Sequence, residues 1–398
     1  MEKRHFSVSQ PNNLLTIGDT DVYLTNALED IVVNYPPRSR YPHEVLQGLW
    51  SGPTGIGYLM LQVSSYRPGL LISGQPAAHW ALGYVSGSRG HNLRLGSHGC
   101  GITDERLSWE AVRAAVSKDI RHVREFVSSV SQVCQVQEFP DEIHYGRAGT
   151  LYLLRLVRHW VPESKPLVDP AIDEISNTII KNGPDWKWHG KRYLGAAHGD
   201  VGIVTQLVLT SPSVAPQLES VVTRLLDLQH SDGNWPSHEG HHHGGKTLVQ
   251  FCHGAPGFLF SLLSLRQHFP TLHDRIDAAI ERARECVWNE GLLRKEPSLC
   301  HGVFGNALTF PVGPRRDHFL GVATPEHVAE MKRMDPTGTV FQRADYGRAY
   351  STLTSYTPGA VWAWLQSKEE TPRMLAYNDF DEILALDGRN VEVPVQVA

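Results

Sequence analysis

The sequence predicts an all-α protein, an α/α toroid (double-ring barrel) of seven helical hairpins with about fourteen helices. A Gly-x-x-Gly pattern recurs roughly every fifty residues, a spacing typical of repeat architectures. Each copy leads into an apolar run of helical length, and amphipathic segments lie between the copies. Patterns with the period of two that is typical of β-strands are nearly absent.

The glycine pattern has intact copies and degraded ones. In one degraded copy Tyr356 stands in place of the first glycine and Gly359 is the second, and another lies at 96–101. Because glycine allows a sharp turn and close backbone packing, we expect all these turns at one narrow end of the barrel. The intact copies are Gly52–Gly55, Gly146–Gly149, Gly199–Gly202, Gly254–Gly257 and Gly302–Gly305.

Each repeat is expected to contain an outer amphipathic helix, a loop, a glycine turn and an inner apolar helix. Gly149 leads into TLYLLRLVRHWV, which suits a buried inner helix, and the segment 218–226 carries its apolar residues on one face. Asp169-Pro170 and Thr324-Pro325 each place a capping residue before a proline, which predicts helix starts there. The expected result is a ring of inner helices inside a ring of outer ones.

Residues 1–368 are predicted to form a single toroid domain, and residues 369–398 a C-terminal tail that is partly helical at Phe380–Leu386. The net charge of −5 gives no basic field for nucleic acid. The apolar runs are too short to span a bilayer, so no transmembrane segment is expected. The five cysteines are an odd and sparse set, which favours a reducing compartment and a cytoplasmic protein.

Three glycine turns carry metal-binding residue types directly before their first glycine. They read Ala197-His198-Gly199, Cys252-His253-Gly254 and Cys300-His301-Gly302. If the turns meet at one mouth, two cysteines and three histidines meet there too, and zinc favours this ligand chemistry.

We therefore predict one zinc ion per chain, bound by Cys252, Cys300 and His301. Three protein ligands leave a fourth position for water or a substrate thiol, which would become a thiolate there. His198 is then free of the metal and can transfer a proton. A structural zinc, or two buried free cysteines, is the alternative interpretation of the same residues.

The strings YGRAG, GAAHG, CHGAPG and LCHG, in this order, with SDGNWPS before the fifth repeat, resemble those of the LanC-like (lanthionine synthetase C-like) family. The start at Arg4-His5-Phe6 resembles the eukaryotic glutathione-binding branch. The resemblance covers roughly Arg4 to Gln366 and implies a zinc-dependent enzyme that adds a thiol, foremost glutathione, to an electrophilic alkene and forms a thioether. The electrophile is expected to be a dehydroamino acid in a peptide or protein, or a small unsaturated metabolite.

By this resemblance, Cys252, Cys300 and His301 match the zinc ligands, and His198 matches the proton-transfer histidine. The family also has an acidic residue near the third glycine pair, for which Asp141 and Glu142 are both candidates. Glutathione contacts are expected from residues that match cationic positions of the family. These are Arg4 and Lys295, with Arg348 as a further candidate.

Some features leave other functions open. Leu248 stands where the cyclases carry an arginine, which puts lanthionine ring formation in doubt. A non-catalytic zinc- and glutathione-binding adaptor is the alternative function, and a glycosidase or a zinc prenyltransferase subunit would be other toroids. The loop of His238 and His241–His243 is a weaker metal candidate. Trp186 and Trp188 suit either a substrate wall or core packing.

Overall fold

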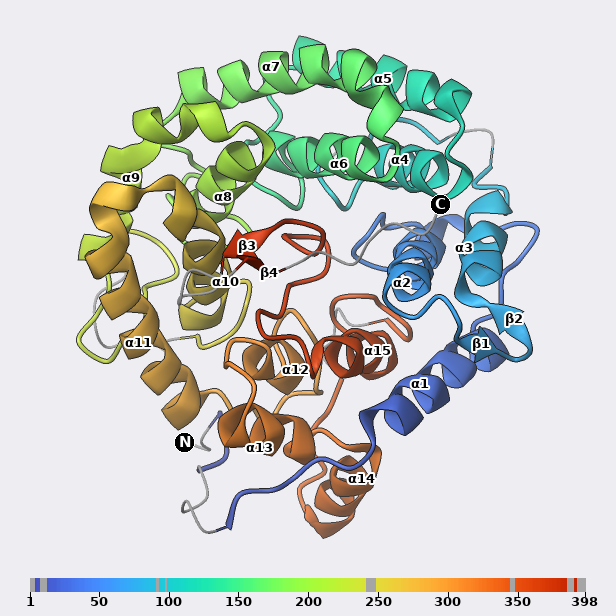
Figure 1. The fold of residues 1–398 in the computed structure, drawn as a ribbon, viewed down its shortest axis with the longest axis vertical. Coiled ribbons are helices and arrows are strands. Elements are labelled where there is room, and N and C mark those ends of the chain that lie inside the picture. Colours follow the sequence, from blue (N-terminus) through green and yellow to red (C-terminus); the bar gives the residue numbers. More distant parts are fainter. Residues whose placement is uncertain are drawn as a thin grey trace.

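Fifteen α-helices in the described part of the chain form two concentric rings (Figure 1). The predicted α/α toroid is therefore confirmed. The computed structural model describes residues 4–7, 13–90, 93–96, 99–240, 248–343, 348–384 and 390–391. The inner ring consists of α2 (Pro53–Tyr66), α4 (Glu105–Ser117), α6 (Arg147–Trp160), α8 (Asp200–Thr210), α10 (Ala255–Leu265), α12 (Val303–Ala307) and α15 (Tyr356–Gln366).

Each inner helix follows an outer one, which gives seven hairpins. The seventh hairpin has two outer helices, so the described helices number fifteen rather than fourteen. The outer helices are α1 (Thr20–Asn34), α3 (Ala77–Ser86), α5 (Ile120–Gln135), α7 (Lys165–Asn182), α9 (Ala215–Asp227), α11 (His273–Glu290), α13 (Pro314–Val322) and α14 (Pro325–Met334).

Burial separates the two rings in the way that their sequences predict. Every residue of α10 is buried, because an inner helix contacts the outer ring on one side and the lumen on the other. In α9 only one face is buried, and it is the apolar face of residues 218–226. Thr324 caps α14 as predicted. The predicted helix start at Asp169 is wrong, because α7 begins at Lys165 and tolerates Pro170 in its second turn, near the helix N-terminus.

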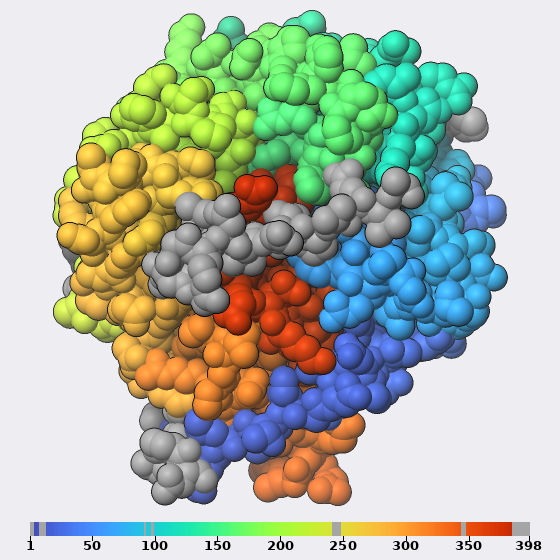
Figure 2. All heavy atoms as spheres, viewed as in Figure 1, coloured from blue at the N-terminus to red at the C-terminus, as the bar shows by residue number. Residues whose placement is uncertain are grey.

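Residues 370–384 are not a peripheral tail, and residues 380–384 are not helical as the sequence predicts. Residues 371–380 are all buried. Figure 1 shows this segment, in red, inside the ring of inner helices, and Figure 2 shows red atoms near the middle of the same face. The carboxyl group of Asp379 joins this segment to the inner helices, because it accepts hydrogen bonds from Tyr58 Oη at 2.5 Å, Gln62 Nε2 at 2.7 Å and Tyr152 Oη at 2.9 Å. We call residues 371–383 the lumen plug.

The strands in the described part of the chain are short, and one of them, Ile383–Leu384, begins at the end of the lumen plug inside the inner ring. The strand β1 (Leu71–Ile72) pairs antiparallel with β2 (Gln75–Pro76), and β3 (Ile383–Leu384) pairs antiparallel with β4 (Asn390–Val391). None of the helices in the described ranges combines the length and the apolar character needed to cross a membrane. Short 3-10 helices occur at His43–Val45, Pro162–Ser164, Pro212–Val214, Arg266–His268 and Pro270–Leu272.

Candidate thiol and metal site

The glycine turns are joined to one another by a closed ring of backbone hydrogen bonds. Each turn donates one N–H to a carbonyl oxygen of the next, so turns far apart in sequence are held at one rim. Glycine is needed here because a Cβ on Gly257 would lie 2.1 Å from the Phe251 carbonyl oxygen, and Gly254 has φ +101°. The ring runs from Leu49 to Ile102, Ile143, Ala197, Cys252, Cys300 and Leu353, and returns to Trp50, with N–O distances of 2.8 to 3.4 Å.

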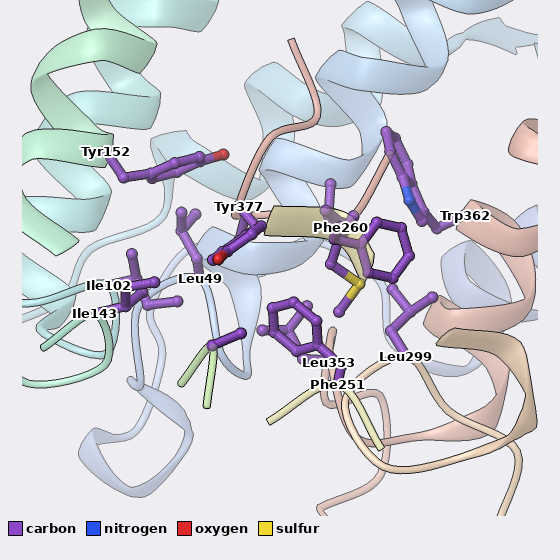
Figure 3. Packing of buried hydrophobic residues seen from close by; sticks show 14 of the residues in the cluster. Leu49, Ile102, Ile143, Tyr152, Phe251, Phe260, Leu299, Leu353, Trp362 and Tyr377 are labelled. Carbon is purple, nitrogen blue, oxygen red and sulfur yellow. The ribbon is translucent and has the colours of Figure 1, made fainter. Parts of the chain in front are cut away.

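Neighbouring residues of each turn point to opposite sides of this rim. One side is an apolar layer over the lumen plug, seen in Figure 3 beside Phe260 and Tyr377. On the other side, the next residue of the same turns lines an open cavity, so the apolar layer is the floor of the cavity. Leu49, Ile143, Phe251 and Leu299 belong to the floor, and Trp50, His144, Cys252 and Cys300 line the cavity.

The cavity has a volume of about 980 Å³. Of the predicted site residues, it brings together His198, Cys252, Cys300, His301 and Lys295. Further lining residues come from the first two repeats and from the turns themselves. They are His43, Leu46, Gln47, Trp50, Leu93, Arg94, Leu95, Gly96, Gly99, Thr103, Asp104, Glu105, His144, Tyr145, Leu248, Gln250 and His253.

Cys252 and Cys300 form a hydrogen-bonded pair of thiols at the cavity wall. The hydrogen bond from the Cys300 thiol holds the pKa of Cys252 well below its ordinary value, although burial opposes this shift. Gln250 Nε2 also donates to Cys252 Sγ at 3.0 Å, and Lys295 Nζ donates to Gln250 Oε1 at 3.0 Å. The same pairing raises the pKa of Cys300. The sulfur pair thus favours one thiolate, and a cation supports it through Gln250.

His301 follows Cys300 directly and lines the same cavity. Burial lowers the pKa of His301 to about 4, so its imidazole is neutral near pH 7, which is the form that binds a metal. Within the described ranges, no three His, Cys, Asp or Glu side chains have their donor atoms arranged to hold an ion. The donor chemistry fits zinc, since two sulfurs are already paired and a neutral imidazole stands beside them.

The structure distinguishes between the two acidic candidates. Glu142 Oε2 lies 2.6 Å from His198 Nδ1, and Glu142 also accepts from the backbone N–H groups of His144 and Tyr145. Since this carboxylate accepts from His198, Nδ1 carries a proton and Nε2 is left for proton exchange. Asp141 instead binds Arg147 Nη1 at 2.8 Å and Asn182 Nδ2 at 2.9 Å. Asp141 is therefore structural, and Glu142 is the partner of His198.

An aromatic stack fixes the face of His198. The rings of Trp188 and His198 are parallel within 7°, with centroids 4.1 Å apart, and Tyr145 lies parallel to both. Trp188 thus packs against His198 but does not line the cavity, so it supports the histidine and does not form a wall for the substrate. Trp186 is buried, and its Nε1 donates to the Ile179 carbonyl oxygen, so it is a core residue.

The three cationic candidates differ in their placement. Lys295 lines the cavity. Arg4 is held beside it, because its carbonyl oxygen accepts from Arg294 N at 3.0 Å, and its charge lowers the pKa of Lys295 after the larger effect of burial. Arg348 is exposed and does not line the cavity, and its carbonyl oxygen accepts from Ser351 N at 3.2 Å. His241–His243 lie outside the described residues.

Sequence reasoning missed two residues of the site. Gln250 bridges Lys295 and Cys252, and nothing in the local sequence marks it. His144 could have been found, because it stands two residues before Gly146, as Cys252 and Cys300 stand two residues before their own glycines. An alignment of the repeats alone would have placed His144 at the mouth.

The rings and the rim define an α/α-toroid protein with a thiol-rich cavity at its glycine turns. The family model for lanthionine synthetase C-like protein matches residues 112–311, about half of the chain. The protein therefore belongs to the lanthionine synthetase C-like family.

Two curated relatives and one solved structure extend this result. A glutathione S-transferase LANCL1 of Danio rerio is 28% identical over 290 residues, covering 66% of this chain and 68% of that protein. A LanC-like protein GCL1 of Arabidopsis thaliana is 31% identical over 183 residues, covering 42% of this chain but only 41% of the relative. The structure of nisin cyclase matches with a TM-score of 0.56 and 13% identity, over 86% of this chain and 93% of the cyclase. At that identity the likeness bears on the fold alone.

Proposed function

We propose that this protein is a zinc-dependent enzyme that activates the thiol of glutathione and adds it to an electrophilic alkene. The alkene would be a dehydroamino acid or a similar unsaturated compound, and the product a thioether. One observation carries the proposal. The sulfur pair of Cys252 and Cys300, which favours a thiolate, lines the same cavity as His198, whose ring is oriented by the Glu142 carboxylate. Thiol binding and proton transfer can therefore act on one substrate.

Cys252, Cys300 and His301 would hold the zinc ion. When bound, zinc supplies Lewis acidity that turns an incoming thiol into a thiolate at neutral pH. The sulfur pair supports this assignment, because its shared hydrogen bond already favours loss of one proton. The five cysteines are free thiols, which suits an enzyme of the cytoplasm, where we propose that it acts.

Lys295 and Arg4 would bind the carboxylates of glutathione. Lys295 reaches the cavity next to Gln250, which touches Cys252, so a carboxylate at Lys295 is near the sulfur site. Charge-assisted hydrogen bonds to carboxylates are the strongest polar contacts available to such a tripeptide. The name of the Danio rerio relative supports glutathione as the thiol.

His198 would manage the proton. Its Nδ1 is occupied by Glu142, so Nε2 takes up the thiol proton and later delivers it to the carbon next to the electrophile's carbonyl group. Glu142 keeps the ring in one orientation and stabilises the imidazolium that forms between the two transfers. The stack against Trp188 limits rotation of the ring. A protein that only binds glutathione needs none of these three features, so they favour the enzyme over the adaptor.

The acidic residues in the cavity do not support a glycosidase. Asp104 accepts from Leu107 N at 2.9 Å and Gly96 N at 2.6 Å. Glu105 accepts from Thr54 Oγ1 at 2.6 Å and from Gly48 N at 2.8 Å. Both carboxyl groups are thus engaged by the protein, whereas a glycosidase needs two carboxyl groups facing the substrate.

The proposal is tested by incubating the zinc-loaded full-length chain with glutathione and a dehydroalanine peptide. Mass spectrometry should show the glutathione adduct forming faster than in protein-free buffer, and His198→Ala should lower the rate by about 100-fold. Binding of glutathione without acceleration would favour the adaptor instead. A peptide that carries both a cysteine and a dehydroalanine tests ring formation, which Leu248 at the cavity wall places in doubt.

A further inference from the structure

We infer that His144 is a further catalytic residue, whose ring N–H binds the carbonyl oxygen of the electrophile while that oxygen becomes an enolate. The inference rests on the proposed function and deepens it. It makes the second substrate an α,β-unsaturated carbonyl compound, such as a dehydroamino-acid amide.

The first support is the placement of the His144 ring. The ring lies edge-on between Trp50 and His198, with centroid distances of 4.7 and 4.9 Å. Its backbone is fixed, because N donates to Glu142 Oε2 at 2.9 Å and the carbonyl oxygen accepts from Thr103 Oγ1 at 2.6 Å. Both the backbone and the packed ring are therefore held in place before any substrate enters.

The second support is that the nitrogens of the His144 ring have no hydrogen-bond partner in the described part of the protein. His144 is 5% exposed and lines the cavity. In the part of the chain that the structure describes, neither ring nitrogen makes a hydrogen bond. Neither ring nitrogen is among the fully buried side-chain atoms that lack a partner, so the nitrogens keep contact with the cavity. A ring N–H that faces the cavity can donate a hydrogen bond to an acceptor atom on a bound substrate.

The ring is also uncharged, which suits a donor that keeps its proton. Burial lowers the pKa of His144 well below its ordinary value, and the neighbouring His198 and His253 lower it further. A neutral imidazole donates one hydrogen bond from whichever nitrogen carries the proton. His198, beside it, remains the group that exchanges protons.

The chemistry needs two such groups side by side. The glutathione thiol gives its proton to His198, and its sulfur then forms a bond to the β-carbon of the alkene. The alkene electron pair moves toward the carbonyl group and places negative charge on its oxygen, where the His144 N–H donates a hydrogen bond. The α-carbon next takes the proton from His198, and the carbonyl double bond re-forms. Because the oxygen and the α-carbon are joined to one carbon atom, their two partners must be neighbours, as His144 and His198 are.

The cavity offers apolar surface to the electrophile. Leu46, Trp50 and Leu95 line the cavity, Trp50 packs against the His144 ring, and the carboxyl groups of Asp104 and Glu105 are engaged by the protein. An unsaturated amide offers apolar carbon to these side chains and one carbonyl oxygen to His144. Preorganised donors of this kind contribute about 100-fold or more to the rates of reactions that develop charge on oxygen.

The test compares two reactions of glutathione on the zinc-loaded full-length enzyme. The first is addition to N-acetyl-dehydroalanine amide, which passes through an enolate. The second is alkylation by iodoacetamide, which displaces iodide and forms no enolate. His144→Phe keeps an aromatic ring and removes the N–H, His144→Asn keeps a donor, and His79→Phe makes the same change at an exposed residue outside the cavity.

We expect His144→Phe to lower kcat for the addition by about 100-fold with a small change in KM, and to leave the alkylation rate within about twofold. The kcat of His144→Asn for the addition should be at least about tenfold higher than that of His144→Phe. His79→Phe should match the wild type. If the Phe variant does not fold, His144→Leu replaces it. An equal loss in both reactions, or no loss of addition, would overturn the role of His144 while leaving glutathione activation intact. A wild-type enzyme that alkylates but does not add would overturn the proposed function itself, and the inference with it.

Discussion

The backbone amide of Cys252 donates to the carbonyl oxygen of Cys300 at 3.3 Å, and their thiols are hydrogen-bonded to each other. The two residues come from different hairpins. They meet because the closed ring of backbone hydrogen bonds joins their glycine turns. One contact therefore serves the fold and the site at once. It brings the two thiols together, and their pairing favours loss of the first proton.

This pairing predicts how zinc binding depends on each cysteine. The purified chain should contain about one zinc ion, and Cys252→Ala or Cys300→Ala should abolish binding at stoichiometric metal, because two remaining ligands hold zinc poorly. Cys286→Ala is the matched control, since Cys286 is a buried cysteine on α11 away from the rim. Elemental analysis of the dialysed proteins measures the metal. Zinc retained in both rim variants would show that the ligand set is wrong.

The hydrogen bond between Glu142 and His198 predicts unequal effects of two adjacent substitutions. Glu142→Gln should lower kcat for conjugate addition by about 100-fold, because the ring loses its charged partner and its fixed tautomer. Asp141→Asn should leave kcat of the folded enzyme near that of the wild type. It should instead lower the free energy of unfolding by about 3 kcal/mol, because Arg147 would stay buried without a carboxylate.

Steady-state kinetics and urea unfolding on both variants check this pair. A large fall in kcat for Asp141→Asn, together with an unchanged Glu142→Gln, would reverse the assignment. Such a result would also remove the reason for treating Arg147 and Asp141 as a structural pair.

The placement of the cations predicts a difference in glutathione affinity. Lys295→Met should raise the dissociation constant of glutathione by about tenfold or more, since a charge-assisted hydrogen bond contributes about 1.5–3 kcal/mol. Arg348→Met removes a cation that does not line the cavity and should change the constant less than twofold. Calorimetric titration measures both. Equal losses in the two variants would mean that glutathione reaches beyond the cavity as the structure defines it.

The toroid and the rim could be predicted from sequence because their causes are local. The second glycine of each intact turn lies where a Cβ would meet backbone, as Gly305 does at 1.9 Å from the Leu299 carbonyl oxygen. The requirement for glycine therefore repeats with every hairpin and marks each turn. The residues before the first glycine then reach the rim by the same geometry, so Cys252, Cys300 and His198 could be placed together without coordinates.

Other features depend on contacts that no local pattern records. Asp141 and Glu142 are adjacent and of the same type, and only the path of the backbone decides which one faces His198. The segment around Asp379 follows the seventh predicted hairpin, so the sequence predicts a partly helical tail there. It is buried because Tyr58 and Tyr152, from two different repeats, satisfy its carboxyl group inside the lumen. Such a segment can be placed only when its distant partners are known.

The buried carboxyl group of the lumen plug predicts a specific dependence of stability on pH. Burial raises the pKa of Asp379 from 3.8 to about 6, against the hydrogen bonds from Tyr58 and Tyr152 that lower it. The folded state thus holds this proton more tightly than the unfolded state. The resulting stability is fully present below about pH 4 and is lost as the pH rises through about 6. About two pKa units correspond to about 3 kcal/mol.

Asp379→Asn cannot ionise, so the free energy of unfolding of the wild type minus that of the variant should fall by about 3 kcal/mol between pH 4 and pH 7. Urea unfolding at several pH values measures this difference, and taking the difference cancels the contributions of the other carboxyl groups. Asp173→Asn on α7 is the control, because its exposed side chain is hydrated in both states. A difference that stays constant or grows with pH would mean that the hydrogen bonds from the tyrosines outweigh burial and that Asp379 is a carboxylate at the centre of the toroid.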